Sequence, residues 1–311
     1  MIVVCGETLV DLVPAGDGLW RALPGGSPAN VAVALARLGT PVAMLARIAT
    51  DPFGVLLRDR LMREHVDMRY VVTAREPSTL AVVSFDEAGN ARYSFYLEGT
   101  ADWQWRIEEF PPVFGPETVA LHAGSMALMR PPGGAVVEGV LRREFPHRVI
   151  SVDPNVRAVL CPDPAQYRAA VERWLEHAHI VKASVDDVRW LYPGVSPDDV
   201  LLRWLRLGPL VVVLTLGADG AMARSASGAA VTVPGMSVPV VDTIGAGDTF
   251  SGALLHHFAR NGALSIEKLR VIDEGELAAA LRFAAAAAAV TCQRAGADPP
   301  RLQEIPGEAS A

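Results

Sequence analysis

A Gly-Ala-Gly-Asp turn at residues 245–248 is the strongest chemical signal in the sequence, and a helix-compatible stretch follows it as far as Arg260. Small residues let backbone N–H groups converge, and a following helix adds the positive end of its dipole. Gly245, Ala246 and Gly247 are therefore predicted to form an anion hole for a transferring phosphoryl group. Asp248 is a candidate general base for the attacking hydroxyl. The structural alternative is a tight turn with an aspartate N-cap.

A second loop, at residues 25–30, reads Gly-Gly-Ser-Pro-Ala-Asn and leads into an apolar helical segment that ends at Gly39. Gly25 and Gly26 allow a ligand to approach the backbone closely, and Asn30 offers one acceptor and two donors for hydroxyl groups. The loop lacks the GK[ST] ending of a Walker A motif and does not match GxGxxG. It is a candidate binding loop for a hydroxyl-bearing ligand, or else only the entry into a helix.

These loops must be positioned by the surrounding elements, in which short apolar runs alternate with helical stretches. The predicted strands lie at residues 2–5, 41–47, 119–121, 148–152, 179–181 and 211–216. This alternation predicts an α/β fold with a mostly parallel sheet that is covered on both faces. Such sheets bind ligands beyond the carboxyl ends of their strands, so the residues that follow each strand are the ones to inspect.

One region interrupts the alternation with three successive strands, at residues 68–73, 79–86 and 91–96, and a turn at 88–90. We expect these strands to form a small sheet that projects from the main domain as a lid. A second antiparallel patch is predicted as a hairpin of residues 220–225 and 229–233 around Gly228.

The composition excludes several classes of protein. Half of the residues are apolar and a fifth are charged, which is not the composition of a disordered chain. The formal charge is −7, only two residues are lysines and no basic cluster occurs, so we expect no nucleic acid as a partner. The three cysteines are far apart and form no CxxC pair. The stretch from Ala278 to Val290 is mostly alanine and carries Arg282, so we expect a buried helix, no membrane span and a cytoplasmic location.

The two loops, in this order, resemble the paired signatures of the ribokinase (PfkB) family of carbohydrate kinases. The resemblance covers the whole chain, and within the family it is greatest to bacterial fructokinases. It implies a ribokinase-like three-layer α/β/α sandwich, as a single domain over residues 1–311, with a lid built from about residues 12–23 and 68–103. The supporting motifs are Gly-Glu at 6–7, Asp-Pro-Phe-Gly at 51–54, Tyr-Ser-Phe-Tyr at 93–96, Ala-Asp-Trp at 101–103, Asp-Pro-Asn-x-Arg at 153–157 and Thr-x-Gly-x-x-Gly at 215–220.

The resemblance implies transfer of the γ-phosphoryl group of ATP to a primary hydroxyl of a sugar, foremost of fructose to give fructose 6-phosphate. It assigns the role of the base to Asp248 and that of the anion hole to residues 245–247. The residues expected to bind the sugar are Asp11, Gly25, Gly26, Asn30, Arg92, Asn155 and Arg157. Those expected on the nucleotide side are Lys182, Ser184, Thr215, Gly217 and Gly220.

The resemblance also implies Mg²⁺, with Asp187 near it through water, and in some members a monovalent cation such as K⁺ at a loop that Asp242 matches. Relatives often dimerise through the lid sheet, so a homodimer is expected. Ala285 stands where relatives often carry an asparagine near the adenine or ribose, so nucleotide contact there is expected to be apolar or through the backbone.

Several alternatives remain at this point. Leu97-Glu98 replaces a basic residue of many fructokinases, so 2-keto-3-deoxygluconate kinase, ribokinase and nucleoside kinase activities compete with fructokinase. An acid sugar would need a carboxylate partner, which Arg92 or Arg157 would supply. A catalytically silent sugar-binding regulatory protein is the alternative from another class, but it should have lost the base or the anion hole. A nicotinamide-dependent oxidoreductase would need GxGxxG after the first strand, where Gly6-Glu7 stands instead.

Overall fold

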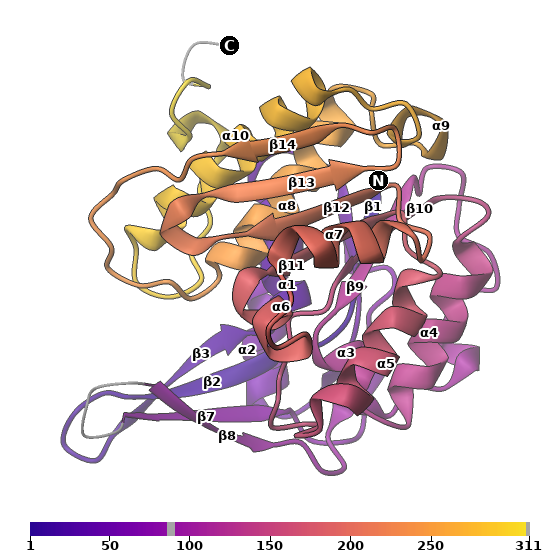
Figure 1. The fold of residues 1–311 in the computed structure, drawn as a ribbon. Coiled ribbons are helices and arrows are strands. Elements are labelled where there is room, and N and C mark those ends of the chain that lie inside the picture. The colour runs from indigo at the N-terminus through magenta and orange to yellow at the C-terminus, as the bar shows by residue number, and fades with distance from the viewer. Residues whose placement is uncertain (86–90, 309–311) are drawn as a thin grey trace.

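An eight-stranded sheet runs through the centre of the computed structural model, which describes residues 1–85 and 91–308 (Figure 1). Six neighbouring strands are parallel. The predicted hairpin forms strands β13 and β14, which continue the sheet in antiparallel orientation at one edge. The spatial order is β14 (Ala230–Val233), β13 (Ala221–Ser225), β12 (Val211–Thr215), β11 (Ile180–Ser184), β10 (Val149–Asp153), β9 (Ala120–Gly124), β1 (Ile2–Cys5) and β4 (Val42–Leu45).

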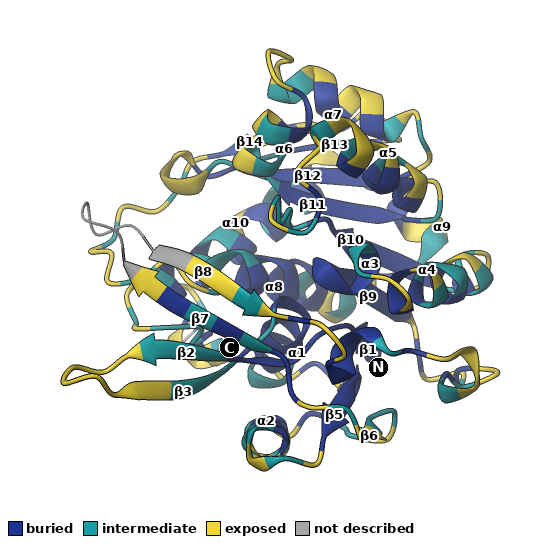
Figure 2. Cartoon of the chain, turned by 90° about the horizontal axis from the view of Figure 1, so that it is seen from below, coloured by how far each residue is buried: buried dark blue, intermediate teal, exposed yellow. Residues whose placement is uncertain are grey.

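Helices cover both faces of this sheet, because alternate strand residues point to opposite sides. On β1, Ile2 and Val4 pack into one core cluster and Val3 and Cys5 into the other. The first cluster includes residues of α1 (Ser27–Arg37), α2 (Pro52–Arg63), α8 (Ala246–Arg260) and α10 (Glu274–Cys292). The second includes residues of α4 (Gly133–Glu144), α5 (Pro164–Leu175), α6 (Val185–Leu191) and α7 (Pro197–Leu205). The strands are buried between these layers (Figure 2), so the predicted three-layer sandwich is confirmed.

Short helices complete the chain: α3 (Met126–Met129), α9 (Ile266–Leu269), and the 3₁₀ turns η1 (Ala101–Trp103), η2 (Ile107–Glu109), η3 (Gly217–Asp219) and η4 (Leu302–Glu304). By length and composition alone α10 would be apolar enough to cross a membrane. It packs along α8, however, and places Leu277, Leu281 and Phe283 in the first core cluster. We therefore describe α10 as a core helix, which agrees with the prediction for residues 278–290.

A smaller four-stranded sheet projects from the main body (Figure 1), in the order β3 (Trp20–Gly25), β2 (Leu9–Pro14), β7 (Leu80–Phe85) and β8 (Ala91–Tyr96). β2 pairs antiparallel with β3 and β7 with β8, whereas β2 and β7 are parallel. The first of the three strands predicted for the lid is wrong. Only its end is a strand, β6 (Val72–Ala74), and β6 does not join the smaller sheet. It pairs in parallel with β5 (Arg47–Ala49), a short strand that follows β4. The predicted turn at 88–90 lies outside the described residues.

Helices α1 and α8 approach closely at Gly252, two turns of helix from the start of α8. A Cβ atom at this position would lie 2.8 Å from the Cβ atom of Ala34 and 3.2 Å from the carbonyl oxygen of Val31, both on α1. The absence of a side chain at Gly252 therefore sets the distance between the two helices that follow the predicted chemical loops.

We predict that Gly252→Ala lowers the free energy of unfolding by about 1–3 kcal/mol, because the added methyl overpacks the α1–α8 contact. Gly139→Ala in α4 is the matched control, since a Cβ atom there meets nothing within 4 Å. The control should gain up to about 1 kcal/mol from helix propensity. Urea denaturation of both variants measures the difference, and equal gains in stability would contradict the close contact.

Candidate active site

Two adjoining cavities lie beyond the carboxyl ends of the parallel strands, where such sheets bind ligands. The cavity nearer to β10, β9 and β1 has a volume of about 460 Å³ and is called the first cavity below. The cavity nearer to β12 and β11 has a volume of about 700 Å³ and is called the second cavity. The two share Asn155, Thr243 and Gly247 in their walls. A ligand in one cavity is therefore next to a ligand in the other at the start of α8.

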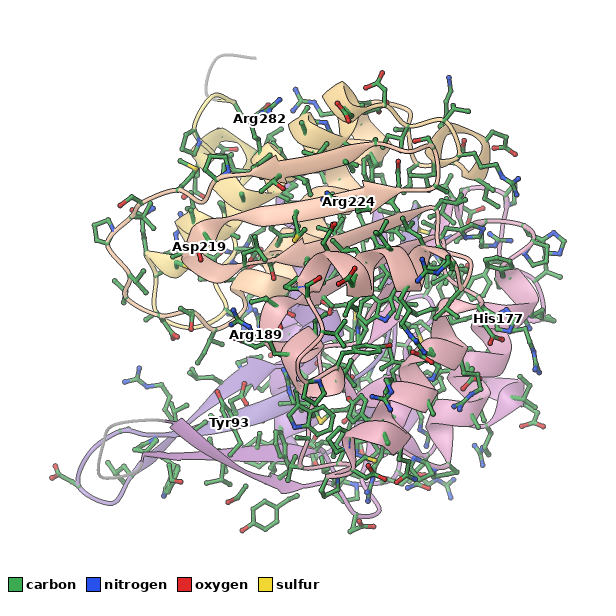
Figure 3. All side chains as sticks on the ribbon, in the orientation of Figure 1. Tyr93, His177, Arg189, Asp219, Arg224 and Arg282 are labelled. Atoms are coloured by element: carbon green, nitrogen blue, oxygen red, sulfur yellow. The ribbon has the colours of Figure 1, made fainter. Side chains whose placement is uncertain are left out.

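The first cavity brings together most of the residues predicted to bind the sugar or to carry the chemistry: Asp11, Gly26, Asn30, Asn155, Arg157, Gly245, Gly247 and Asp248. Tyr93 of β8 adds a wall from the smaller sheet (Figure 3). Two predicted residues are placed differently. Gly25 does not line the cavity; it ends β3 beside Asp11, whose carboxylate a side chain at Gly25 would overlap. The side chain of Arg92 lies outside what the structure describes.

Asp248 lies in the first turn of α8, in the wall of the first cavity and next to Gly247, which both cavities share, and is only 8% exposed. The hydroxyl of Ser27 donates a hydrogen bond to its Oδ1 atom at 2.6 Å, and Nδ2 of Asn30 donates to its Oδ2 atom at 2.8 Å. Burial raises the pKa of Asp248, and these two hydrogen bonds counteract part of the rise. The carboxylate is thus held in one orientation by donors from α1, with a raised affinity for a proton.

The predicted anion hole is the N-terminal turn of α8. Gly245 is the N-cap in the left-handed conformation, with φ 76°, which a residue without a side chain adopts easily. The first N–H groups of a helix have no partners within it, and the helix dipole is positive there. The N–H group of Ala246 already donates to the carbonyl of Thr243 at 3.2 Å. Gly247 is exposed to both cavities and is therefore the residue of this turn best placed to meet a phosphoryl group.

Asp11 and Arg157 provide charge elsewhere in the first cavity. Burial raises the pKa of Asp11 to about 6, and the guanidinium groups of Arg60 and Arg157 oppose the shift. Nη1 of Arg157 donates to the Oδ1 atom of Asn155 at 2.7 Å, so the two predicted sugar contacts of this loop also hold each other. Glu7, with Asp11, Asp248 and Arg157, gives the cavity more carboxylates than cations among the described residues.

The second cavity collects the residues predicted for the nucleotide: Lys182, Ser184, Asp187, Thr215, Gly217 and Gly220, with Ala246 and Gly247 from α8. The turn η3, which carries Asp219 in Figure 3, forms the part of its wall between β12 and β13. On the opposite side Ala285, Ala288 and Ala289 of α10 give an apolar wall. This wall agrees with the apolar contact expected at Ala285.

Lys182 is buried at the border of the cavities. Its Nζ atom lies 3.0 Å from Oδ2 of Asp153 and would be 3.1 Å from a Cβ atom placed on Gly247. Burial lowers the pKa of Lys182, but the carboxylates of Asp153, Asp248 and Asp187 raise it to a net value above the ordinary one. The ammonium group therefore stays charged beside the first turn of α8.

The two candidate metal ligands have other hydrogen-bond partners. Both oxygens of Asp187 accept backbone N–H groups, from Val156 at 2.9 Å and Ser184 at 3.0 Å. Asp242 lines neither cavity, and its oxygens accept N–H groups of Ile244 and Gly296. No group of three His, Cys, Asp or Glu residues that could hold a metal ion occurs in residues 1–85 and 91–308. These features fit a divalent cation that is held mainly by nucleotide phosphates and water.

Four polar residues of the site are not among those predicted from the sequence: Glu7, Ser27 and Ser125 of the first cavity, and Asp153 as a partner of Lys182. Ser27 lies within the Gly-Gly-Ser-Pro-Ala-Asn loop, and Glu7 and Asp153 lie within motifs that were singled out. Ser125 follows β9 directly, but the predicted strand ended at Leu121, three residues before the observed end at Gly124, so Ser125 was not placed at its carboxyl end.

Two cavities that meet at a helix N-terminus, beside a buried carboxylate, are compatible with phosphoryl transfer between two bound substrates. The pfkB family of carbohydrate kinases matches residues 1–304. A fructokinase from Rhizobium leguminosarum bv. trifolii is 37% identical over 281 residues, which cover 89% of this chain and 85% of that protein. The chain therefore belongs to the pfkB family of carbohydrate kinases, as its motifs predicted.

Solved structures give the same result. A fructokinase from Xylella fastidiosa with bound ATP has a TM-score of 0.87 at 29% identity, with 95% of this chain and 93% of that chain covered. A fructokinase from Vibrio cholerae O395 with fructose, ADP and a calcium ion has a TM-score of 0.82 at 28% identity, with 95% and 94% covered. The predicted ribokinase-like fold and the predicted carbohydrate kinase class are both confirmed.

We predict that Lys182→Met lowers the free energy of unfolding by about 3–5 kcal/mol, because the substitution leaves Asp153 buried without its cation. The other lysine, Lys268, is exposed and provides the matched control. Lys268→Met should change stability by no more than about 0.5 kcal/mol. Urea denaturation monitored by circular dichroism compares the two, and similar small losses in both variants would contradict a structural ion pair.

Proposed function

We propose that this protein is a fructokinase, which transfers the γ-phosphoryl group of ATP to the 6-hydroxyl of fructose. The observation that carries the proposal is the place of Asp248, buried in the first turn of α8 in the wall of the first cavity and next to Gly247, which both cavities share. The relatives named fructokinase support fructose as the substrate. In this arrangement fructose binds in the first cavity and ATP in the second.

The chemistry follows from the residues around Asp248. Ser27 and Asn30 fix both oxygens of the carboxylate, so that a remaining lone pair accepts the proton of the sugar hydroxyl as it attacks in line. Lys182 and the N-terminal turn of α8 stabilise negative charge on the transferring group. The smaller sheet supplies Tyr93 and Phe95 to the cavity wall and, as a lid, excludes water that would otherwise accept the phosphoryl group.

The charges in the first cavity favour a neutral sugar over an acid sugar. Glu7, Asp11 and Asp248 outnumber Arg157 there, and the Nη1 group of Arg157 is engaged by the Asn155 loop. A substrate carboxylate would meet repulsion from the carboxylates that are ionised. The charges that line the first cavity therefore favour fructose over 2-keto-3-deoxygluconate as the substrate. Ribose and nucleosides are neutral, so charge does not separate them from fructose.

Magnesium, when bound, would neutralise charge on the nucleotide phosphates, with Asp187 contributing from the second cavity through water. The monovalent cation at the Asp242 loop stays a prediction. We also propose that the chain works as one domain over residues 1–311, as a homodimer through the smaller sheet and in the cytoplasm.

A substrate panel tests the proposed function. Purified protein with ATP and Mg²⁺ is given fructose, 2-keto-3-deoxygluconate, ribose or adenosine, and kcat/KM is measured for each. We expect fructose to give the highest value, with fructose 6-phosphate as the product. Another sugar ranked above fructose would overturn the assignment, and sugar binding without consumption of ATP would favour the regulatory protein instead.

We predict that Asp248→Asn lowers kcat by at least about 10²–10⁴-fold, the usual contribution of a positioned acid–base group. ATP affinity should stay near the wild-type value, because the substitution leaves the second cavity intact. Asp59→Asn, at an exposed position on α2, is the matched control and should leave kcat unchanged. A variant Asp248→Asn with near-wild-type turnover would remove Asp248 from the mechanism.

A further inference from the structure

Three buried polar atoms of the first cavity have no hydrogen-bond partner in the described chain: Oε1 of Glu7, Oγ of Ser125 and Oδ1 of Asn30. Glu7 and Ser125 are each only 1% exposed. Buried polar atoms are almost always paired in proteins, so partners for these atoms are expected from a ligand or from water. Asn30 already belongs to the predicted sugar loop, whereas Glu7 and Ser125 have no role so far.

The sheet delivers Glu7 and Ser125 to the same place. Glu7 follows β1 and Ser125 follows β9, and these strands are parallel neighbours that pair Cys5 with Ala123. The other oxygen of Glu7, Oε2, accepts the N–H group of Ala127 at 3.2 Å, on the turn that begins at Ser125. The hydroxyl of Ser125 also interacts with the carboxyl group of Glu7, so the two side chains are neighbours, and no other described group pairs with Oε1 of Glu7. Both residues line the first cavity and neither lines the second.

The backbone at Ser125 is held in a costly conformation. Its φ of 56° and ψ of −142° are a combination that residues with a side chain rarely adopt, and its N–H group donates to the carbonyl of Asp153 at 2.9 Å. Such strain persists only where the surroundings enforce it, and it clusters at ligand sites. Glycine would relieve the strain here, so the hydroxyl group is retained at an energetic cost.

We propose that Glu7 and Ser125 form a specificity subsite of the first cavity. The subsite binds hydroxyl groups of the same sugar other than the one that attacks ATP. This inference rests on the proposed function. A carboxylate oxygen accepts a hydrogen bond and a serine hydroxyl both donates and accepts, so the pair satisfies a sugar hydroxyl in both directions. Because the site is buried, a sugar that lacks the matching hydroxyl leaves this pair without its ligand partner and is disfavoured. Glu7 and Ser125 therefore set the preference among neutral sugars.

The position of Glu7 in a buried environment adds to this chemistry. Burial raises the pKa of Glu7 to about 7, while a backbone hydrogen bond, the hydroxyl of Ser125 and, more weakly, the guanidinium of Arg157 oppose the rise. The carboxyl group therefore binds a proton more readily than an ordinary glutamate side chain. It can accept a hydrogen bond from a sugar hydroxyl or donate one to it.

The test compares wild type, Glu7→Gln and Ser125→Ala on fructose and on analogues that each lack one hydroxyl: 1-deoxyfructose, 3-deoxyfructose, 4-deoxyfructose and 2,5-anhydromannitol. We expect wild type to disfavour at least one analogue by about 100-fold or more in kcat/KM. Each variant should lose about 10-fold or more on fructose, mainly through KM, and little on that analogue. The discrimination between the two substrates then collapses in the variants.

Two further variants keep the result interpretable. Ser125→Gly removes the hydroxyl and relieves the strained backbone, so it serves if Glu7→Gln fails to fold. Glu108→Gln, at an exposed position of η2, is the matched control and should keep the wild-type preference. Fructose binding without nucleotide is measured by calorimetry for every protein, and the weaker binding expected for the site variants separates a binding role from a purely structural one.

The outcomes distinguish this inference from the proposed function. If wild type phosphorylates fructose but the Glu7 and Ser125 variants discriminate among the analogues as wild type does, the specificity subsite is overturned and the fructokinase proposal stands. If wild type neither binds nor phosphorylates fructose, the proposed function fails and the inference falls with it. Loss of discrimination with retained folding supports both.

Discussion

The two hydrogen bonds that Asp248 receives across the contact between α1 and α8 organise much of the rest of the structure. A carboxylate buried to this extent must be fully paired, and its donors, Ser27 and Asn30, come from a helix more than two hundred residues earlier in the chain. The pairing requires that α1 and α8 lie side by side on one face of the sheet, and the missing side chain at Gly252 permits that distance. The loops at residues 25–30 and 245–248 are thus parts of one site, although the sequence of one loop does not predict its contact with the other.

The order of the strands translates into an order of functions along one edge of the sheet. Thr215 and Ser184 end β12 and β11 at the second cavity, which we propose for the nucleotide. Asn155 follows β10 and lines both cavities, and Ser125 and Glu7 follow β9 and β1 at the first cavity, which we propose for the sugar. Lys182 lies where carboxylates from three separate elements converge, and its charge balances them locally. The net charge of −7 therefore says little about affinity for an anionic nucleotide, because binding depends on the local arrangement of donors.

The sequence was sufficient for the fold class, for most strands to within a few residues and for the two chemical loops, because these depend on local periodicity and turn composition. It was insufficient where pairing is decided by distant partners. Nothing in residues 68–73 indicates that they pair with the strand after β4 instead of joining the smaller sheet. Likewise the pairing of Lys182 with Asp153 and the engagement of both Asp187 oxygens by amide groups arise from tertiary contacts. Ser125 was not predicted as a site residue because the strand before it was predicted to end too early.

The chain passes directly from β3 of the smaller sheet into α1, with Gly26 as the only residue between them. In the proposed mechanism, the sheet that covers the sugar and the helix that orients the proton acceptor are therefore joined by a single residue. Any rotation of the smaller sheet must be absorbed as torsion at Gly26, whose φ of 101° few other residues tolerate, or be passed to Ser27 as a displacement. If the smaller sheet moves as a lid, its movement and the alignment of Asp248 are therefore expected to be coupled through Gly26.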